Sequence, residues 1–164
     1  METWDILDNN GFKTGRYLLR SDKLKNGEYH LVVHVWIIDT NGNILIQKRP
    51  ENVEWMPSVW STTGGSVIKN EKSLNAVIRE TAEELGLVIK TEKFRFLKRY
   101  KGVNDFTDVF IVRGDKEEFS PIILNDEVAD SDWVTILQLK EMINIGSFIN
   151  YQYLSDIFNY LDNY

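Results

Sequence analysis

A chain of 164 residues suits a single domain with its own hydrophobic core, and we expect one domain over residues 1–164. Its 25 acidic and 19 basic residues, a net charge of −6, argue against a nucleic-acid polymer as partner, and the absence of cysteine excludes thiol nucleophiles, disulfides and thiolate metal sites. The apolar runs are too short for a membrane span and the first residues lack the pattern of a secretory signal, so we expect a cytoplasmic protein with no membrane partner.

Short β-branched and aromatic runs predict strands in the first part of the chain. Trp4–Leu7 and Tyr17–Leu19 flank a turn-forming Asp-Asn-Asn-Gly segment, which predicts an N-terminal β-hairpin extension within residues 1–29. Leu31–Ile38 and Ile44–Gln47 flank an Asn-Gly turn, which is typical of hairpins. Later strands are expected at Phe94–Tyr100, Phe106–Val112 and Trp133–Val134.

Three segments have the apolar spacing of helices. The first runs from Ser73 to Leu85 and is followed by Gly86, which favours the left-handed conformation that ends a helix. The others are Ile136–Ile143 and a C-terminal helix over Phe148–Leu161. Because strands and helices alternate along the chain, the predicted fold class is α/β or α+β.

The helix over residues 73–85 has an apolar face and a carboxylate face. At about 100° per residue, Glu80, Glu83 and Glu84 gather on the side opposite the apolar residues. Like charges at this spacing repel by roughly 0.2–0.5 kcal/mol per pair in water. The cluster has two interpretations: a solvated acidic surface, or a site for a hard cation such as Mg²⁺ or Mn²⁺, which carboxylate oxygens bind well.

The spacing of residues around this helix distinguishes the two interpretations. Residues 64–87 fit the pattern Gly-x5-Glu-x7-Arg-Glu-U-x-Glu-Glu-x-Gly-U, where U is apolar, except that Thr81 stands at one apolar position. The matching residues are Gly65, Glu71, Arg79, Glu80, Glu83, Glu84, Gly86 and Leu87. This pattern is the Nudix box, so the chain resembles a Nudix hydrolase. The resemblance implies a Nudix α/β/α sandwich with a mixed central sheet and a C-terminal helix, in which the box forms a loop–helix–loop.

The resemblance also implies roles for the residues of the box. In Nudix hydrolases Mg²⁺ binds the glutamate pair, here Glu83 and Glu84, often together with the carbonyl group of the residue before the box glycine, here Gly64. The glutamate after the arginine, here Glu80, completes the metal shell or acts as the base toward the attacking water, and Arg79 orients it. Mn²⁺ is the alternative metal. The residues with a supporting role are Gly65, Glu71 and Gly86.

Several residues outside the box are further candidates. Lys48 and Arg49 follow a strand that faces the box, where they could pair with substrate phosphates or remain exposed strand-end charges. Trp55 and Trp60 could stack on a base or anchor a loop in the core. Glu127 lies in a later loop, where some family members place a further base or metal ligand.

The predicted function is Mg²⁺-dependent hydrolysis of the diphosphate linkage in a nucleoside diphosphate derivative, either a nucleoside di- or triphosphate or a nucleotide sugar. The partner is then a small-molecule diphosphate, and the aromatic C-terminal tail leaves a homodimer contact open. A non-catalytic nucleotide-binding sensor is an alternative. The complete set of box glutamates argues against it, since a sensor need not retain all of them.

The N-terminal segment adds a second alternative. Residues 4–8 and 29–36 resemble the Nudix branch that includes isopentenyl-diphosphate isomerases, which use a cysteine beside the box glycine and a histidine-rich metal site. Here Gly64 stands at the cysteine position, Ser66 stands at the position of the following histidine, and only His30 could match an upstream ligand. Hydrolysis is therefore preferred. His30 and His34 lie on one face of a strand and are interpreted as hydrogen-bonded or surface groups.

Overall fold

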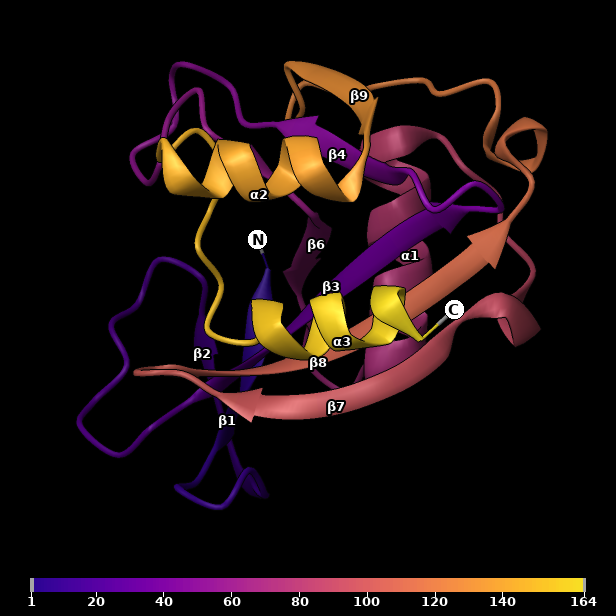
Figure 1. Cartoon of the computed structure of the whole chain (residues 1–164). Helices are drawn as coiled ribbons and strands as arrows, with labels where there is room; N and C mark the ends of the chain where they lie inside the picture. Colours follow the sequence, from indigo (N-terminus) through magenta and orange to yellow (C-terminus); the bar gives the residue numbers. More distant parts are fainter. Residues whose placement is uncertain (1, 164) are drawn as a thin grey trace.

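The computed structural model describes residues 2–163, which form a mixed α+β fold around a seven-stranded sheet (Figure 1). The strands of this sheet are β3 (His30–Asp39), β4 (Ile44–Lys48), β5 (Trp60–Ser61), β6 (Thr63–Ser66), β7 (Arg95–Lys101), β8 (Asp105–Gly114) and β9 (Asp130–Val134). Their order is β5-β4-β3-β8-β7, with β6 paired to β3 and β9 paired to β4. The sheet is mixed because β3 and β8 run parallel while the other pairs are antiparallel.

Helices cover both faces of the sheet. α1 (Ser73–Leu85) lies behind β3 and β8 in Figure 1, and α2 (Ile136–Asn144) and α3 (Leu154–Asp162) lie in front. Alternate residues of β3 build the two halves of the core, since successive side chains of a strand point to opposite faces. Val33 and Val35 pack in the half that contains α1, whereas Trp36 and Ile38 pack in the half that contains α3. The expected three-layer sandwich is thereby confirmed.

The C-terminal helix is shorter than the sequence predicts. α3 begins at Leu154, so the prediction of a helix from Phe148 was wrong for its first six positions. The segment before α3 is extended against β5: Phe148 forms a parallel bridge with Trp60, and the Ile149 N–H donates to the Trp60 carbonyl oxygen at 2.9 Å. Pairing with the sheet therefore outweighs helical spacing in this segment. Elements without a sequence prediction are β5, β6 and the short 3₁₀ helices Thr91–Lys93 and Lys116–Phe119.

The predicted N-terminal hairpin is present as a separate two-stranded sheet of β1 (Thr3–Leu7) and β2 (Lys13–Leu19). It contacts the loop that precedes α1. The Lys69 N–H donates to the Thr3 carbonyl oxygen at 2.7 Å, and the Asn70 N–H donates to Oδ2 of Asp5 at 2.8 Å. The hairpin therefore supports the loop of the predicted box. Across residues 2–163, none of the helices has both the length and the apolar character that crossing a membrane requires.

Candidate functional site

Two of the three helix carboxylates are buried, which the sequence did not predict. The side chains of Glu80 and Glu84 lie with the core-facing residues of α1, at 8% and 6% exposure, while Glu83 is exposed. The sequence predicts that Glu80, Glu83 and Glu84 gather on the side opposite the apolar residues. The structure buries two of them, so this side is not the solvated acidic surface that was the alternative interpretation. The reason lies in β6, where Gly65 leaves room for a side chain: an ideal Cβ at Gly65 would lie 2.2 Å from the Glu80 carboxyl carbon.

Glu84 is held by a short polar chain from the sheet. Its Oε2 accepts a hydrogen bond of 2.9 Å from Nε2 of Gln47 in β4, and Oε1 of Gln47 accepts one of 2.8 Å from the Thr63 hydroxyl. The Gly64 N–H lies 3.4 Å from the same Glu84 oxygen. Burial raises the pKa of Glu84 to about 8, and the hydrogen bond from Gln47 only partly opposes this.

Arg79 connects the carboxylates at the other side of the site. Its Nε and Nη2 donate to the two oxygens of Glu71, each at 3.0 Å, in the bidentate geometry that favours Arg over Lys. Its Nη1 donates to Glu80 at 2.8 Å and to Glu83 at 3.1 Å. Hydrogen bonding to Glu71 raises the pKa of Arg79, so the guanidinium stays charged. The pKa of Glu80 is raised, chiefly by burial, although Arg79 opposes this.

Each glycine in and beside the box is required for a different structural reason. Gly86 ends α1 with a φ of 67°, in the left-handed region that the sequence predicts. At Gly64, an ideal Cβ would lie 2.2 Å from the Val33 carbonyl oxygen and 2.5 Å from Cδ2 of His34. Any side chain at Gly64 or Gly65 would therefore displace the sheet backbone, a histidine ring or a buried carboxylate.

A cavity of about 890 Å³ opens beside these residues. It lies at the end of the sheet where β3 and β8 begin, since His30, His34, Asp105 and Thr107 line it together with glutamates of α1. The sequence-predicted site residues that line it are Arg49, Gly64, Gly65, Glu80, Glu83, Glu84 and Glu127. Lys48, Trp60, Glu71, Arg79 and Gly86 are not among the lining residues of the part of the chain that the structure describes.

Of the candidates between residues 48 and 60, Arg49 and Trp55 line the cavity, whereas Lys48 and Trp60 do not. The Arg49 Nε donates to the Trp55 carbonyl oxygen at 3.0 Å, and its guanidinium lies 5.1 Å from the centre of the Trp55 ring. Trp55 lines the cavity and is 60% exposed. Lys48 and Trp60 instead face each other across the β4–β5 pair, where Trp60 packs against the core below α3.

Sequence reasoning missed several residues at the site. Gln47, which holds Glu84, could have been recognised as a polar residue within a buried apolar strand. His34 is hydrogen-bonded as expected, with its Nδ1 2.6 Å from the Tyr153 hydroxyl oxygen, and both residues also line the cavity. No pattern in the sequence indicated that Tyr151 and Tyr153 reach the site, because they were assigned to a helix.

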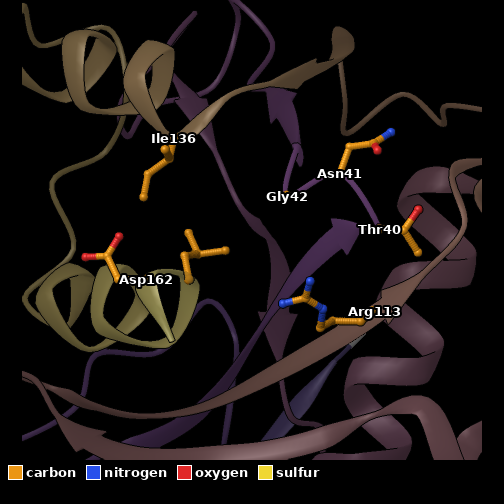
Figure 2. A pocket seen from close by; sticks show the side chains of 7 residues that line it. Thr40, Asn41, Gly42, Arg113, Ile136 and Asp162 are labelled. Carbon is orange, nitrogen blue, oxygen red and sulfur yellow. The ribbon is translucent and has the colours of Figure 1, made fainter. Parts of the chain in front are cut away.

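A second, smaller cavity lies at the opposite end of β3 (Figure 2). It has a volume of about 280 Å³ and is lined by the turn that follows β3, the start of α2 and the end of α3. Arg113 and Asp162 are its charged side chains. Because the box glutamates lie at the other end of β3, this cavity is separate from the site described above.

The site has the donor set of a divalent cation. Across residues 2–163, no three His, Asp or Glu side chains converge closely enough to form a ready-made metal site. Glu80 and Glu83 instead bind Arg79, and Glu84 binds Gln47. Glu80 and Glu83 are already compensated by Arg79, but ionised Glu84 is buried with a raised pKa and is costly without a positive charge beside it. Clustered carboxylate and carbonyl oxygens are the ligands that Mg²⁺ and Mn²⁺ prefer, so the residues fit such a cation.

Comparison with known proteins identifies a family. Residues 28–154 match the NUDIX domain family. The chain is 38% identical over 160 residues to the uncharacterized Nudix hydrolase lmo0368 of Listeria monocytogenes, covering 97% of this chain and 95% of that protein. It is 30% identical over 132 residues to isopentenyl-diphosphate Delta-isomerase 2 of Photorhabdus laumondii, covering 76% and 73%.

Solved structures share the fold. DR0079 from Deinococcus radiodurans superposes with a TM-score of 0.76 at 21% identity and covers 95% of this chain and 96% of that one. A bifunctional NMN adenylyltransferase/ADP ribose pyrophosphatase from Francisella tularensis, complexed with AMP and a Mn ion, has a TM-score of 0.63 at 18% identity and covers 81% and 42%.

Fold, motif and family match together define the class of protein. The chain belongs to the Nudix hydrolase family, whose members act on phosphorus-containing acid anhydrides and typically use a divalent metal ion.

Proposed function

We propose that this protein is a Mg²⁺-dependent hydrolase of the diphosphate linkage in nucleoside diphosphate derivatives, with Mn²⁺ as the alternative metal. One observation above all supports the proposal: Glu80, Glu83 and Glu84 of the box line a cavity of about 890 Å³, large enough for a nucleotide-sized ligand. The Mn ion in the Francisella tularensis structure is consistent with a divalent cation at this fold.

The metal is proposed to bind Glu80, Glu83 and Glu84 together with the Gly64 carbonyl oxygen. When bound there, a divalent cation neutralises the diphosphate and lowers the pKa of water. Glu84 must then be deprotonated, and Arg79 must share Glu80 and Glu83 with the cation. The bidentate pair between Arg79 and Glu71 keeps the guanidinium in place during this exchange.

The base and the phosphate-binding residue are proposed among the other residues that line the cavity. Glu80 or Glu127 is proposed as the base that accepts a proton from the attacking water. Both line the cavity, and the charge of Glu127 adds to the raised pKa of Glu80, which indicates that they lie near each other. Arg49, which also lines the cavity, is proposed to bind a substrate phosphate. Lys48 and Trp60 lie outside this cavity, so their proposed contribution is to position Arg49 through the β4–β5 pair.

A substrate panel tests the proposal. The protein is incubated with nucleoside diphosphates, triphosphates, nucleotide sugars, dinucleotides and isopentenyl diphosphate in the presence of Mg²⁺ or Mn²⁺, and phosphate release and isomer formation are followed. We expect cleavage of at least one diphosphate that stops when the metal is chelated. We also expect Glu83→Gln to lower kcat/KM by about 100-fold or more. Absence of cleavage across the panel, or a Glu83→Gln variant with wild-type rates, would contradict it.

One observation favours a second function. The chain is 30% identical to a named isopentenyl-diphosphate isomerase, and His30 lines the same cavity. Gly64 at the position where the resemblance places the isomerase cysteine argues against this activity. The panel separates the two functions, because a product with a shifted double bond identifies the isomerase. A sensor would bind a nucleotide and cleave none. A cytoplasmic location and a homodimer contact remain predictions from the sequence.

A further inference from the structure

His34 lines the cavity and also contacts a buried tyrosine. Its Nδ1 lies 2.6 Å from the hydroxyl oxygen of Tyr153. Within residues 2–163, this is the hydrogen bond that the structure gives to the ring, and Nε2 is not among the buried polar atoms without a partner. Because His34 lines the cavity while its Nδ1 contacts the buried Tyr153, Nε2 is the ring nitrogen that can meet a ligand there.

The contacts of Tyr153 decide which ring nitrogen carries the proton. Tyr153 is 2% exposed, and its hydroxyl oxygen lies 3.4 Å from Nε1 of Trp36. An indole N–H is a donor only, so the Tyr153 oxygen accepts from Trp36. The buried Tyr153 O–H needs an acceptor of its own, and in the described part of the chain His34 Nδ1 is the acceptor within reach. Nδ1 therefore accepts, and the proton of the neutral imidazole resides on Nε2.

Packing fixes this arrangement. The Tyr153 ring stacks with both Tyr100 and Tyr151, with ring centroids 5.0 Å and 5.3 Å away. Trp36 is fully buried and meets the Tyr153 ring edge-on. The hydroxyl group thus has little freedom to move away from His34, and the histidine ring keeps a single orientation.

The position of His34 places its Nε2–H group near Gly64 and the box glutamates. His34 pairs with Gly64 across β3 and β6, and an ideal Cβ at Gly64 would lie 2.5 Å from His34 Cδ2, the carbon bonded to Nε2. The Gly64 N–H in turn lies 3.4 Å from Glu84. A diphosphate bound beside the box glutamates would therefore meet the Nε2–H group. A neutral donor suits this position, since it can bind a phosphate oxygen without competing with the cation for the carboxylates.

We propose that the Nε2–H group of His34 is a fixed hydrogen-bond donor to a phosphate oxygen of the substrate, and that Tyr153 is the positioning residue that selects this tautomer. The proposal rests on the proposed diphosphate hydrolysis.

Nitrogen-15 NMR tests the tautomer without any need for activity. The chain contains two histidines, so a His30→Gln variant assigns the imidazole signals. We expect His34 to be protonated at Nε2 in the wild-type protein and Tyr153→Phe to convert part of the population to the Nδ1–H tautomer. Tyr29→Phe is the matched control, because the Tyr29 hydroxyl contacts Asn9 and the signals should not change. An Nδ1–H tautomer in the wild type, or a Tyr153→Phe spectrum identical to the wild type, would overturn the positioning role.

Ligand binding and kinetics test the donor. Imidodiphosphate with Mg²⁺ is the non-hydrolysable probe, and we expect it to shift the His34 Nε2–H signal; no shift at saturation overturns the contact. With a substrate from the panel, His34→Leu should lower kcat/KM by about 10- to 100-fold, whereas His34→Gln, whose amide N–H can replace Nε2–H, should recover most of the loss. Equal losses in both variants, or none in either, contradict the proposal. If the wild type cleaves nothing, the proposed function fails, while the probe shift still decides the role of His34.

Discussion

At the scale of single residues, protonation of Glu84 makes the stability of the fold depend on pH. Its ordinary pKa is 4.5, and burial raises it to about 8 in the folded protein. The folded state therefore binds the proton more tightly than the unfolded state, and the metal-free protein loses stability as the pH rises from about 4.5 to about 8.

Glu84→Gln removes this dependence, because the amide cannot ionise. We expect unfolding experiments in chelator to show that the variant exceeds the wild type in stability by on the order of a few kcal/mol above about pH 8, and that the two converge below about pH 4. Glu83→Gln is the matched control, since the Glu83 side chain is 54% exposed. Parallel pH profiles for wild type and Glu84→Gln would show that the carboxylate is not buried as described.

Arg79 contributes both to stability and to activity, and the two contributions can be measured separately. A lysine cannot reproduce the two parallel bonds to Glu71 together with those to Glu80 and Glu83. We expect Arg79→Lys to lower the free energy of unfolding by about 1–3 kcal/mol and kcat/KM by about 10-fold or more.

Arg99→Lys gives the control for Arg79. Arg99 forms a similar two-bond pair with the buried Asp108, at 2.6 Å and 2.8 Å, and neither residue lines the cavity within the described chain. This variant should lose comparable stability in urea unfolding and keep its kcat/KM. If both variants lose activity equally, the effect of Arg79 is on folding alone.

At the scale of elements, the N-terminal hairpin supports the box loop. Oδ2 of Asp5 in β1 accepts from the Asn70 N–H at 2.8 Å and from Lys13 in β2 at 2.6 Å. Asn70 has a φ of 67°, a conformation that a non-glycine residue adopts at some cost and that this contact helps to hold. Asp5→Ala should therefore accelerate hydrogen exchange of the Asn70 amide by about 10-fold.

The control for Asp5→Ala is a substitution of Asp22, which lies shortly after β2. Asp22 accepts from the Leu19 N–H and makes no hydrogen bond to the box loop among residues 2–163. Asp22→Ala should leave exchange at Asn70 unchanged. If it has the same effect as Asp5→Ala, the hairpin acts through its general stability and not through the Asp5 contact.

The elements also show what the sequence could predict. Local signals sufficed for α1, whose apolar spacing and terminal Gly86 give its observed bounds, and for β3 and β4, which flank an Asn-Gly turn. The strand β6 escaped prediction because its Gly-Gly pair has little strand propensity, and it forms by pairing with β3. The segment 148–153 has helical spacing but pairs with β5, a contact that no local pattern encodes.

The same limit applies to the site. The box residues could be identified from their spacing, yet helical periodicity did not show that Glu80 and Glu84 are buried. Their burial depends on the space that Gly64 and Gly65 leave in a different element. Likewise, the contact between His34 and Tyr153 joins residues 119 positions apart in the chain. Contacts of this kind require the assembled sheet.

At the scale of the whole molecule, the two ends of β3 have different characters. One end opens into the cavity with Glu80, Glu83, Glu84 and Glu127, whereas the smaller cavity at the other end has Asp162 as its acidic lining residue. The net charge of −6 is therefore concentrated in part at one end of the sheet. A cation bound there should stabilise the fold as a whole, because it binds the folded state and relieves the repulsion among these carboxylates.

Metal, proton and stability should consequently be coupled. A carboxylate must be deprotonated to bind a cation, and the pKa of Glu84 lies at about 8, so binding at neutral pH displaces its proton. We expect Mg²⁺ to raise the Tm and, in calorimetric titrations in two buffers of different ionisation enthalpy, to release close to one proton at about pH 7 and little at about pH 9. Glu84→Gln should release almost none at either pH. Proton release that is equal at both pH values, or unaltered in Glu84→Gln, would place the cation away from Glu84.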